Sequence, residues 1–261
     1  MSGKIHSIGD DFWNIRGSFR IGKVIDVGTQ TSLVRRGNGK FIILDAYTLD
    51  GAALKMVNEL TNNGKELEAI LHLHPFHTVH VKIMHVMFPK AKQYGTARHV
   101  ERFPTVPWES LRTEDPACHE LFADDFEFSV PRGVDFISDN ENVHFSSVLA
   151  YHPASRTLHV DDTFMHIRLP APVRLLGLGN TVSLHPTLAK ALEQRPGAAE
   201  EFRDWMNEVT EQWSDTENLC AAHTSALLAE DNRGDSIQRR LQKALTKAES
   251  TLAAHEKKYT A

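Results

Sequence analysis

Apolar residues follow strand-like and helix-like spacings in turn along the first part of the chain. Two runs rich in β-branched residues, 21–28 and 31–36, are followed by a Gly-Asn-Gly turn signal and then by the apolar run 41–47, which predicts a hairpin within residues 20–47. The helical spacing of apolar side chains over 50–63 predicts a helix, and the continuous apolar run at 67–73 predicts a buried strand. The passage therefore has a β-α-β order.

A second stripe with helical spacing follows this strand. Val79, Ile83, Val86 and Met87 predict a helix that ends before the next proline, and residues 92–96 predict another short strand. Strands that alternate with helices in this way indicate a sheet core of the α/β type.

The second half of the chain changes in character. Prolines and weak periodicity over 101–132 predict long loops. Two β runs on either side of 153–155 predict a second hairpin, and apolar spacing over 200–213 predicts a helix. A short strand is expected at 219–223, and an amphipathic C-terminal helix at about 235–258.

Composition and charge narrow the class of protein. With 261 residues, 41% of them hydrophobic and 24% charged, the chain is typical of a folded globular protein. The formal charge of −5 is spread without a basic stripe, so no nucleic-acid partner is expected. No run of 18 apolar residues and no signal peptide is evident, and there are two cysteines, which predicts a cytoplasmic protein without a membrane partner. No linker is evident either, so one domain over 1–261 is expected.

Histidines gather where the buried strand 67–73 ends. His72 and His74 lie two residues apart, so a strand places both imidazoles on one side, and the turn that follows brings His77 towards them. Convergent imidazoles at the end of a sheet strand are typical of a transition-metal site. The alternative is that each histidine is an ordinary partly buried side chain with a hydrogen-bond partner.

This segment resembles the His-x-His-x-Asp-His motif of the metallo-β-lactamase superfamily. His144 falls where the third histidine ligand of that family is expected, Asp162 in His-Val-Asp-Asp-Thr-Phe falls at the bridging aspartate, and His223 at the last histidine. The resemblance covers roughly residues 20 to 230. It implies a mixed α/β (α+β) fold, the four-layer αββα sandwich of the metallo-β-lactamase type.

The resemblance also implies two groups of metal ligands, of which the first is His72, His74 and His144, and the second is His77, Asp162 and His223. Zinc is the expected metal, one or two ions per chain, with iron or manganese as alternatives. Phe76 departs from the family pattern, because a metal-binding aspartate stands there. Two divalent ions need negative ligands to offset their repulsion, so we expect one tightly held ion and a second that is weak or absent. By this reasoning Phe76→Asp would raise affinity for the second ion.

The expected activity is hydrolysis of an ester, thioester, lactone or related bond of a small molecule by metal-bound hydroxide. Asp162 is the expected catalytic residue, which orients the hydroxide or accepts its proton. Two alternatives stay open: an iron-dependent redox enzyme of the same fold, and a metal-binding domain without catalysis. The sequence makes no prediction of oligomeric state.

Other polar residues near these motifs receive weaker assignments. Asp45 is expected to be structural, and His80 to be a partly exposed helix residue. His166 and Arg168 follow the Asp162 segment, where they could meet an anionic group of a substrate.

Overall fold

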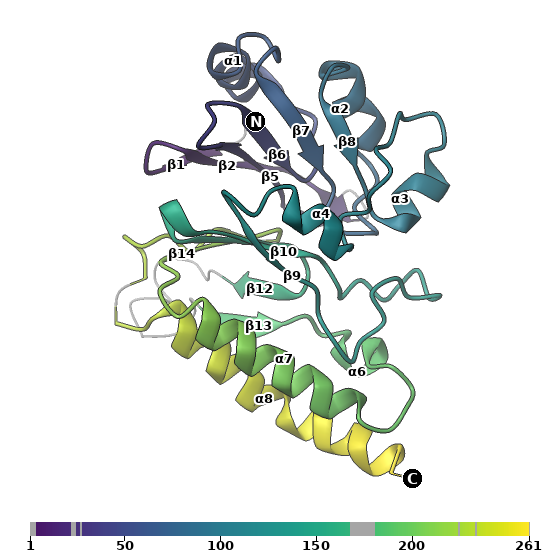
Figure 1. Ribbon diagram of the computed structural model, residues 1–261. Helices are drawn as coiled ribbons and strands as arrows, with labels where there is room; N and C mark the ends of the chain where they lie inside the picture. Colours follow the sequence, from purple (N-terminus) through teal and green to yellow (C-terminus); the bar gives the residue numbers. More distant parts are fainter. Residues whose placement is uncertain are drawn as a thin grey trace. The chain divides into compact units, whose positions relative to one another are not determined.

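The computed structural model describes residues 4–21, 25–26, 28–167, 181–223, 225–232 and 234–260 (Figure 1). By its internal contacts the chain divides into two compact units. Unit 1 comprises Met1–Phe128 and His152–Ser155, and unit 2 comprises Ser129–Tyr151 and Arg156–Ala261. The single domain expected over 1–261 stays a prediction. Within the described ranges, no helix combines the length and the apolar character needed to span a bilayer.

Unit 1 contains a six-stranded sheet in the order β1-β2-β5-β6-β7-β8 (Figure 1). Its strands are β1 (Lys4–Ile8), β2 (Phe12–Gly17), β5 (Thr29–Arg35), β6 (Phe41–Leu44), β7 (Leu67–Leu71) and β8 (Lys92–Tyr94). The first four are antiparallel neighbours, whereas β6, β7 and β8 run parallel. The short β3 (Arg20–Ile21) and β4 (Ile25–Asp26) form a separate antiparallel pair. The hairpin predicted within 20–47 is confirmed by β5 and β6.

The described residues of unit 1 also form α-helices. They are α1 (Gly51–Leu60), α2 (Val81–Met87), α3 (Ala97–Arg102) and α4 (Pro116–Glu120). Parallel neighbours need a crossover, and α1 joins β6 to β7 as α2 joins β7 to β8. Ile15, Leu33, Ile43, Val57 and Ile70 belong to one buried cluster of this unit. The crossovers fix the direction of β7, and with it the end of the strand at which the histidines lie.

Helix α2 has two apolar stripes, and the structure buries the one that the sequence pattern did not single out. Val81 and Met84 are fully buried. Three residues of the predicted stripe, Val79, Ile83 and Val86, are instead 69%, 43% and 73% exposed, while its fourth residue, Met87, is half-buried against the core cluster of unit 1. The predicted helix is therefore present, but helical spacing alone did not identify its buried face.

The sheet carried mainly by unit 2 has the order β14-β11-β10-β9 (Figure 1). Its strands are β9 (Glu127–Ser129), β10 (Leu149–His152), β11 (Thr157–Val160) and β14 (Asn218–Ala221). The 3-10 turn Pro153–Ser155 joins β10 to β11, which confirms the second predicted hairpin. Strands β11 and β14 run parallel, while β12 (Phe164–Ile167) and β13 (Thr181–Leu184) form a separate antiparallel pair.

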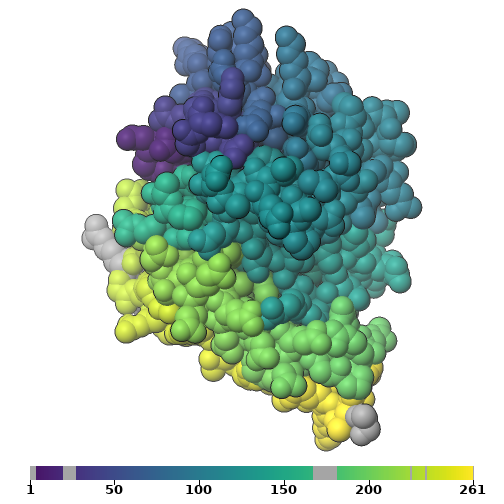
Figure 2. Space-filling model, viewed as in Figure 1, coloured from purple at the N-terminus to yellow at the C-terminus, as the bar shows by residue number. Residues whose placement is uncertain are grey.

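Helices α6 (Leu188–Ala191), α7 (Ala198–Gln212) and α8 (Ile237–Lys258) belong to unit 2. α7 and α8 lie side by side, and their residues adjoin in green and yellow on the face drawn in Figure 2. Ser236 caps α8, because its side chain accepts a hydrogen bond from the Arg239 N–H. The helix expected at about 235–258 is therefore present, and its apolar face contributes Leu252 to the core of the unit.

Candidate metal centre

The predicted histidines of unit 1 lie just beyond the end of β7. His72 is tied to the neighbouring strand, since its backbone N–H donates to the Tyr94 carbonyl at 2.9 Å. The next residue, Leu73, donates its N–H to the Asp45 carboxylate at 2.7 Å. Asp45 lies just past β6 with a left-handed φ of 59°. The carboxylate of Asp45 thus fixes the backbone between His72 and His74, a structural role.

The His72 ring is 1% exposed, and a single hydrogen bond orients it. Gln93 donates its side-chain N–H to the Ala91 carbonyl at 3.1 Å, which turns Oε1 of Gln93 towards His72 Nε2 at 3.2 Å. His72 therefore donates from Nε2 and keeps its lone pair on Nδ1. Among the described residues that buried Nδ1 has no hydrogen-bond partner. Burial lowers the pKa of His72 to about 4, so the ring is neutral at pH 7, as a metal ligand must be.

His74 and His77 form a stacked pair. Their ring centroids lie 4.1 Å apart with 14° between the planes, and each offers a ring nitrogen within 4.8 Å of the other. The His77 N–H donates to the His74 carbonyl at 3.0 Å, which closes the turn between them. His74 is fully buried, and its Nδ1 accepts the Phe76 N–H at 3.0 Å. The turn expected from the spacing thus brings these two imidazoles together.

His99 is a histidine of this region that sequence reasoning left without a role. It is fully buried, and its Nδ1 accepts the Thr96 N–H at 3.2 Å, so Nε2 carries the proton. That Nε2 lies 3.4 Å from the His77 carbonyl, to which it donates. Burial lowers the pKa of His99 well below its usual range. A capping box between Thr96 and His99, three residues apart, was the available sequence signal.

Phe76, the departure from the family motif, contacts both a candidate ligand and a cation. Its ring centroid is 6.1 Å from that of His74, and the two rings meet edge to face. The guanidinium carbon of Arg98, on α3, lies 4.4 Å from the centroid of the Phe76 ring. This distance is within the range of a cation–π interaction.

Parallel pairing brings two of the predicted residues of unit 2 together. Val160 of β11 pairs with Ala221 of β14, and Asp162 and His223 each follow two residues later. Their side chains meet with His223 Nε2 at 2.8 Å from Asp162 Oδ1. Asp162 is 2% exposed and His223 17%. The two side chains are therefore adjacent within unit 2, as their assignment to one group of ligands requires.

His144 and the previously unassigned His185 lie near this pair. Nε2 of His144 lies 2.6 Å from the Glu141 carbonyl. Burial lowers the pKa of His185, while the charge of Asp162 raises it and those of His223 and His144 lower it. Unit 2 thus gathers its three predicted ligands around one further histidine. No motif marked His185, which follows β13 and is brought close by the fold.

Two of the other polar residues with expected roles, His80 and His166, have hydrogen-bond partners within the fold. Nδ1 of His80 lies 2.8 Å from the Thr48 hydroxyl, and the histidine is half-buried. His166 is 1% exposed, and its Nδ1 lies 3.0 Å from the Ser225 carbonyl, which leaves little of the ring available to a substrate. Arg168 lies outside the described residues.

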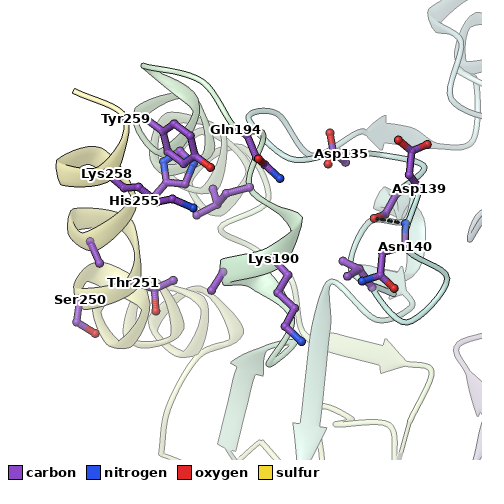
Figure 3. Close-up of a pocket in the computed structure, with 15 residues that line it drawn as sticks. Asp135, Asp139, Asn140, Lys190, Gln194, Ser250, Thr251, His255, Lys258 and Tyr259 are labelled. Carbon is purple, nitrogen blue, oxygen red and sulfur yellow. Dashed lines mark hydrogen bonds between the residues drawn. The ribbon is translucent and has the colours of Figure 1, made fainter. Parts of the chain in front are cut away.

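A cavity of about 740 Å³ in unit 2 is separate from all the predicted ligands. Asp135 and Asp139 lie on one side of it, and His255, Lys258 and Tyr259 on the other (Figure 3). No residue of the predicted ligand set lines it. This cavity therefore does not coincide with the candidate chemistry.

Comparison with known proteins identifies the fold. No family model and no curated protein sequence matches the chain. Among solved structures it is similar to a metallo-β-lactamase from Erythrobacter litoralis, with 11% identity and a TM-score of 0.63 over 95% of this chain and 97% of the other. It is also similar to one from Hirschia baltica, with 8% identity and a TM-score of 0.58 over 94% and 97%. A third is FIM-1 from Pseudomonas aeruginosa in the mono-zinc form, with 10% identity and a TM-score of 0.56 over 95% and 96%. The chain has the metallo-β-lactamase fold over nearly its whole length, as the sequence predicted.

Proposed function

We propose that this protein is a metal-dependent hydrolase that holds one transition-metal ion tightly and cleaves an ester, thioester, lactone or related bond of a small molecule. The proposed ligands of that ion are His72, His74 and His144. His77, Asp162 and His223 are proposed as a second, weaker group. Zinc is the proposed ion, with iron or manganese as alternatives.

The environment of His72 is the observation that carries this proposal. A buried polar atom without a partner is rare in folded proteins, and His72 Nδ1 is such an atom among the described residues. A hydrogen bond from the opposite ring nitrogen to an oxygen is the usual support of a metal-binding histidine, and Gln93 provides it. The residues present at this position therefore fit a transition-metal ion.

The protein's own side chains would bind the ion, orient the attacking water and accept its proton. Neutral imidazoles bind a divalent ion without neutralising it, so the ion retains its charge for catalysis. Such an ion, when bound, lowers the pKa of a coordinated water to about 7 and polarises the bond under attack. Asp162 is proposed to accept the proton of the attacking water, and its contact with His223 holds the carboxylate in place.

The fold also supports the proposal. One structure similar to this chain is described as a mono-zinc form, and the ligand set proposed here is likewise built around one tightly held ion. Fold alone does not define a substrate, so the bond that is cleaved has to be identified by experiment.

Metal analysis followed by substrate profiling tests the proposal. Purified protein supplied with zinc, iron and manganese should retain about one ion per chain, and should hydrolyse at least one class among esters, thioesters and lactones. Asp162→Asn should bind the ion but lose most of the turnover.

Two outcomes favour the alternatives. Bound metal without turnover of any of these bonds would support a domain without catalysis. Iron as the retained ion, with substrate-dependent consumption of dioxygen, would support a redox enzyme.

A further inference from the structure

The cavity of about 740 Å³ in unit 2 has charged groups of opposite sign on its two sides (Figure 3). Asp135 and Asp139, on one side, belong to the segment between β9 and β10, and Lys258, on the other, belongs to α8. Lys190 of α6 also lines the cavity. The charges of these two carboxylates and two ammonium groups cancel, so the lining suits a ligand with separated charges and no net charge.

The charges of the lining are not neutralised by neighbouring side chains. Within the described part of the chain, none of the four takes part in an ion pair. Burial raises the pKa of Asp135, and the like charges of Glu193 and Asp139 raise it further. The ammonium nitrogen of Lys258 lies 4.8 Å from the centroid of the Tyr259 ring, which orients the cation without cancelling its charge. Each side of the cavity would therefore gain from an opposite charge on a ligand.

Both sides of the cavity are attached to one short segment, 191–193. The Asp135 N–H donates to the Ala191 carbonyl at 2.8 Å. From α8, His255 Nε2 donates to the Glu193 carbonyl at 2.9 Å. These hydrogen bonds hold the two sides in place before a ligand arrives, so binding orders little of the protein.

His255 also presents a hydrogen-bond acceptor. Because its Nε2 carries the proton, the other ring nitrogen, Nδ1, has a lone pair. No donor to this Nδ1 is found among the described residues. His255 is 8% exposed and lines the cavity. A buried acceptor usually has a donor, and an N–H group of a ligand would provide one here.

We propose that this cavity binds a small zwitterion of the amino-acid or dipeptide type. The ammonium group of the ligand lies at Asp135 and Asp139, and its carboxylate lies at Lys258. The volume is within the range of small-molecule sites and leaves room for a side chain. Val143 and Leu192, from the buried core cluster of unit 2, also line the cavity and offer that side chain apolar contacts. The site is separate from the proposed metal centre, since no proposed metal ligand lines it.

A thermal-shift screen followed by titration calorimetry tests the proposal. The screen uses the metal-replete protein with millimolar concentrations of the common L-amino acids and of the dipeptides that glycine forms with them. We expect at least one to raise the melting temperature, because a ligand that binds only the native state stabilises it. Its N-acetyl derivative and its amide each lack one charge, so each should bind at least about tenfold more weakly.

Variants of the two sides show where the ligand binds. Asp135→Asn and Lys258→Gln should each lower the affinity at least about tenfold, since each removes a charged partner. Asp204→Asn on α7 and Lys257→Gln on α8 are the matched controls, because they remove the same charges from residues that do not line the cavity. Both controls should bind the ligand as the parent does.

Three outcomes would overturn the proposal. The first is that no amino acid or dipeptide raises the melting temperature. The second is that the N-acetyl derivative or the amide binds as tightly as the zwitterion, which would mean that one side of the cavity is not used. The third is equal binding by all variants, since amino acids also chelate transition metals and would then be held elsewhere. Should Asp135→Asn unfold, as circular dichroism would reveal, Asp139→Asn takes its place.

Discussion

The two units assemble their ligand-type side chains in different ways. In unit 1, His72, His74 and His77 come from six consecutive residues. The fold holds this segment by hydrogen bonds that Gln93 and Asp45 accept and one that His99 donates. In unit 2, His144, Asp162, His185 and His223 come from four separate segments. A set that is local in sequence can be recognised from spacing, whereas a dispersed set becomes visible only once the strands are paired.

The units also differ in how burial affects their histidines. In unit 1, burial lowers the pKa of His72, His80, His99, His119 and His152. In the described part of unit 2, the corresponding shift is resolved for His185. The lowered pKa values in unit 1 keep these imidazoles neutral at pH 7, which suits metal binding but makes that unit sensitive to acid.

The largest expected effect is selective acid unfolding of unit 1 in the metal-free protein. A histidine with a lowered pKa binds its proton more readily when unfolded, so stability falls as pH falls between the two pKa values. For His72 this window runs from about pH 6.5 to about 4, and that residue alone should lower the free energy of unfolding by roughly 3 kcal/mol across it.

Hydrogen exchange at pH 7 and pH 5, corrected for the intrinsic exchange rate, measures this effect. Peptides from β7 and α3 should lose protection before those from α7 and α8. His72→Leu should make the pH dependence shallower. Earlier loss of protection in α7 and α8 would contradict the contrast between the units.

Removal of a proposed ligand should have the next largest effect. Loss of a residue that is hydrogen-bonded to a metal ligand typically lowers metal affinity by roughly 10- to 100-fold. Because His72 is itself a proposed ligand, His72→Ala should lower zinc affinity by more than this. His80→Ala is the matched control, because His80 contacts Thr48 and is not a proposed ligand. Competition against a chromophoric chelator measures both affinities, and equal losses would exclude His72 as a ligand.

The hydrogen bond that His72 donates to Gln93 can be tested without replacing a proposed ligand. Gln93→Leu should lower zinc affinity by about 10- to 100-fold, since His72 would lose the partner that fixes its tautomer. Gln93→Glu keeps an acceptor oxygen and should remain close to the parent. If the leucine and glutamate variants bind zinc equally, His72 is oriented by its packing and not by this hydrogen bond.

The smallest expected effect concerns how unit 2 ties its dispersed segments together. Thr163, beside Asp162, donates its hydroxyl to the Phe145 carbonyl at 2.9 Å and accepts the Ser147 N–H at 3.1 Å. Thr163→Val would leave both buried backbone groups without this partner, and should lower the free energy of unfolding by about 1–2 kcal/mol. Thr246→Val, at an exposed hydroxyl of α8, should change little. Urea unfolding measures the free energy of unfolding of both variants. If Thr163→Val and Thr246→Val are equally stable, Thr163 does not join these segments.

Much of the fold follows from apolar spacing, and the exception is instructive. The sequence predicted the β5–β6 hairpin, α1, β7 and α8, but not the hairpin of β1 and β2. Strand β2 contains Asn14, which is fully buried. Its side-chain N–H groups donate to the side chains of Gln30 and Ser32 on the paired strand β5. A polar residue of this kind has the same appearance in sequence as one that faces solvent. Only the pairing of β2 with β5 shows where its hydrogen bonds are made.

The candidate site shows the same limit. The ligand-type residues were found because a family motif and strand spacing mark them. Gln93, His99 and Arg98 were not given roles, although each contacts a residue of the motif. These contacts depend on the parallel pairing of β7 with β8 and on the placement of α3. Each joins two residues that lie more than twenty positions apart in the chain. Spacing within a segment carries no information on such contacts.

The position of Trp108 has an optical consequence. Its ring centroid lies 5.3 Å from that of His72 and 6.0 Å from that of His99, and its indole N–H donates to the Phe103 carbonyl. An open-shell ion such as Co²⁺ at His72 would quench the emission of this indole, whereas a closed-shell ion such as Zn²⁺ would not. With Trp13, Trp205 and Trp213 replaced by phenylalanine, the remaining tryptophan would report the arrival of Co²⁺ at His72 by the loss of its fluorescence, without any added dye.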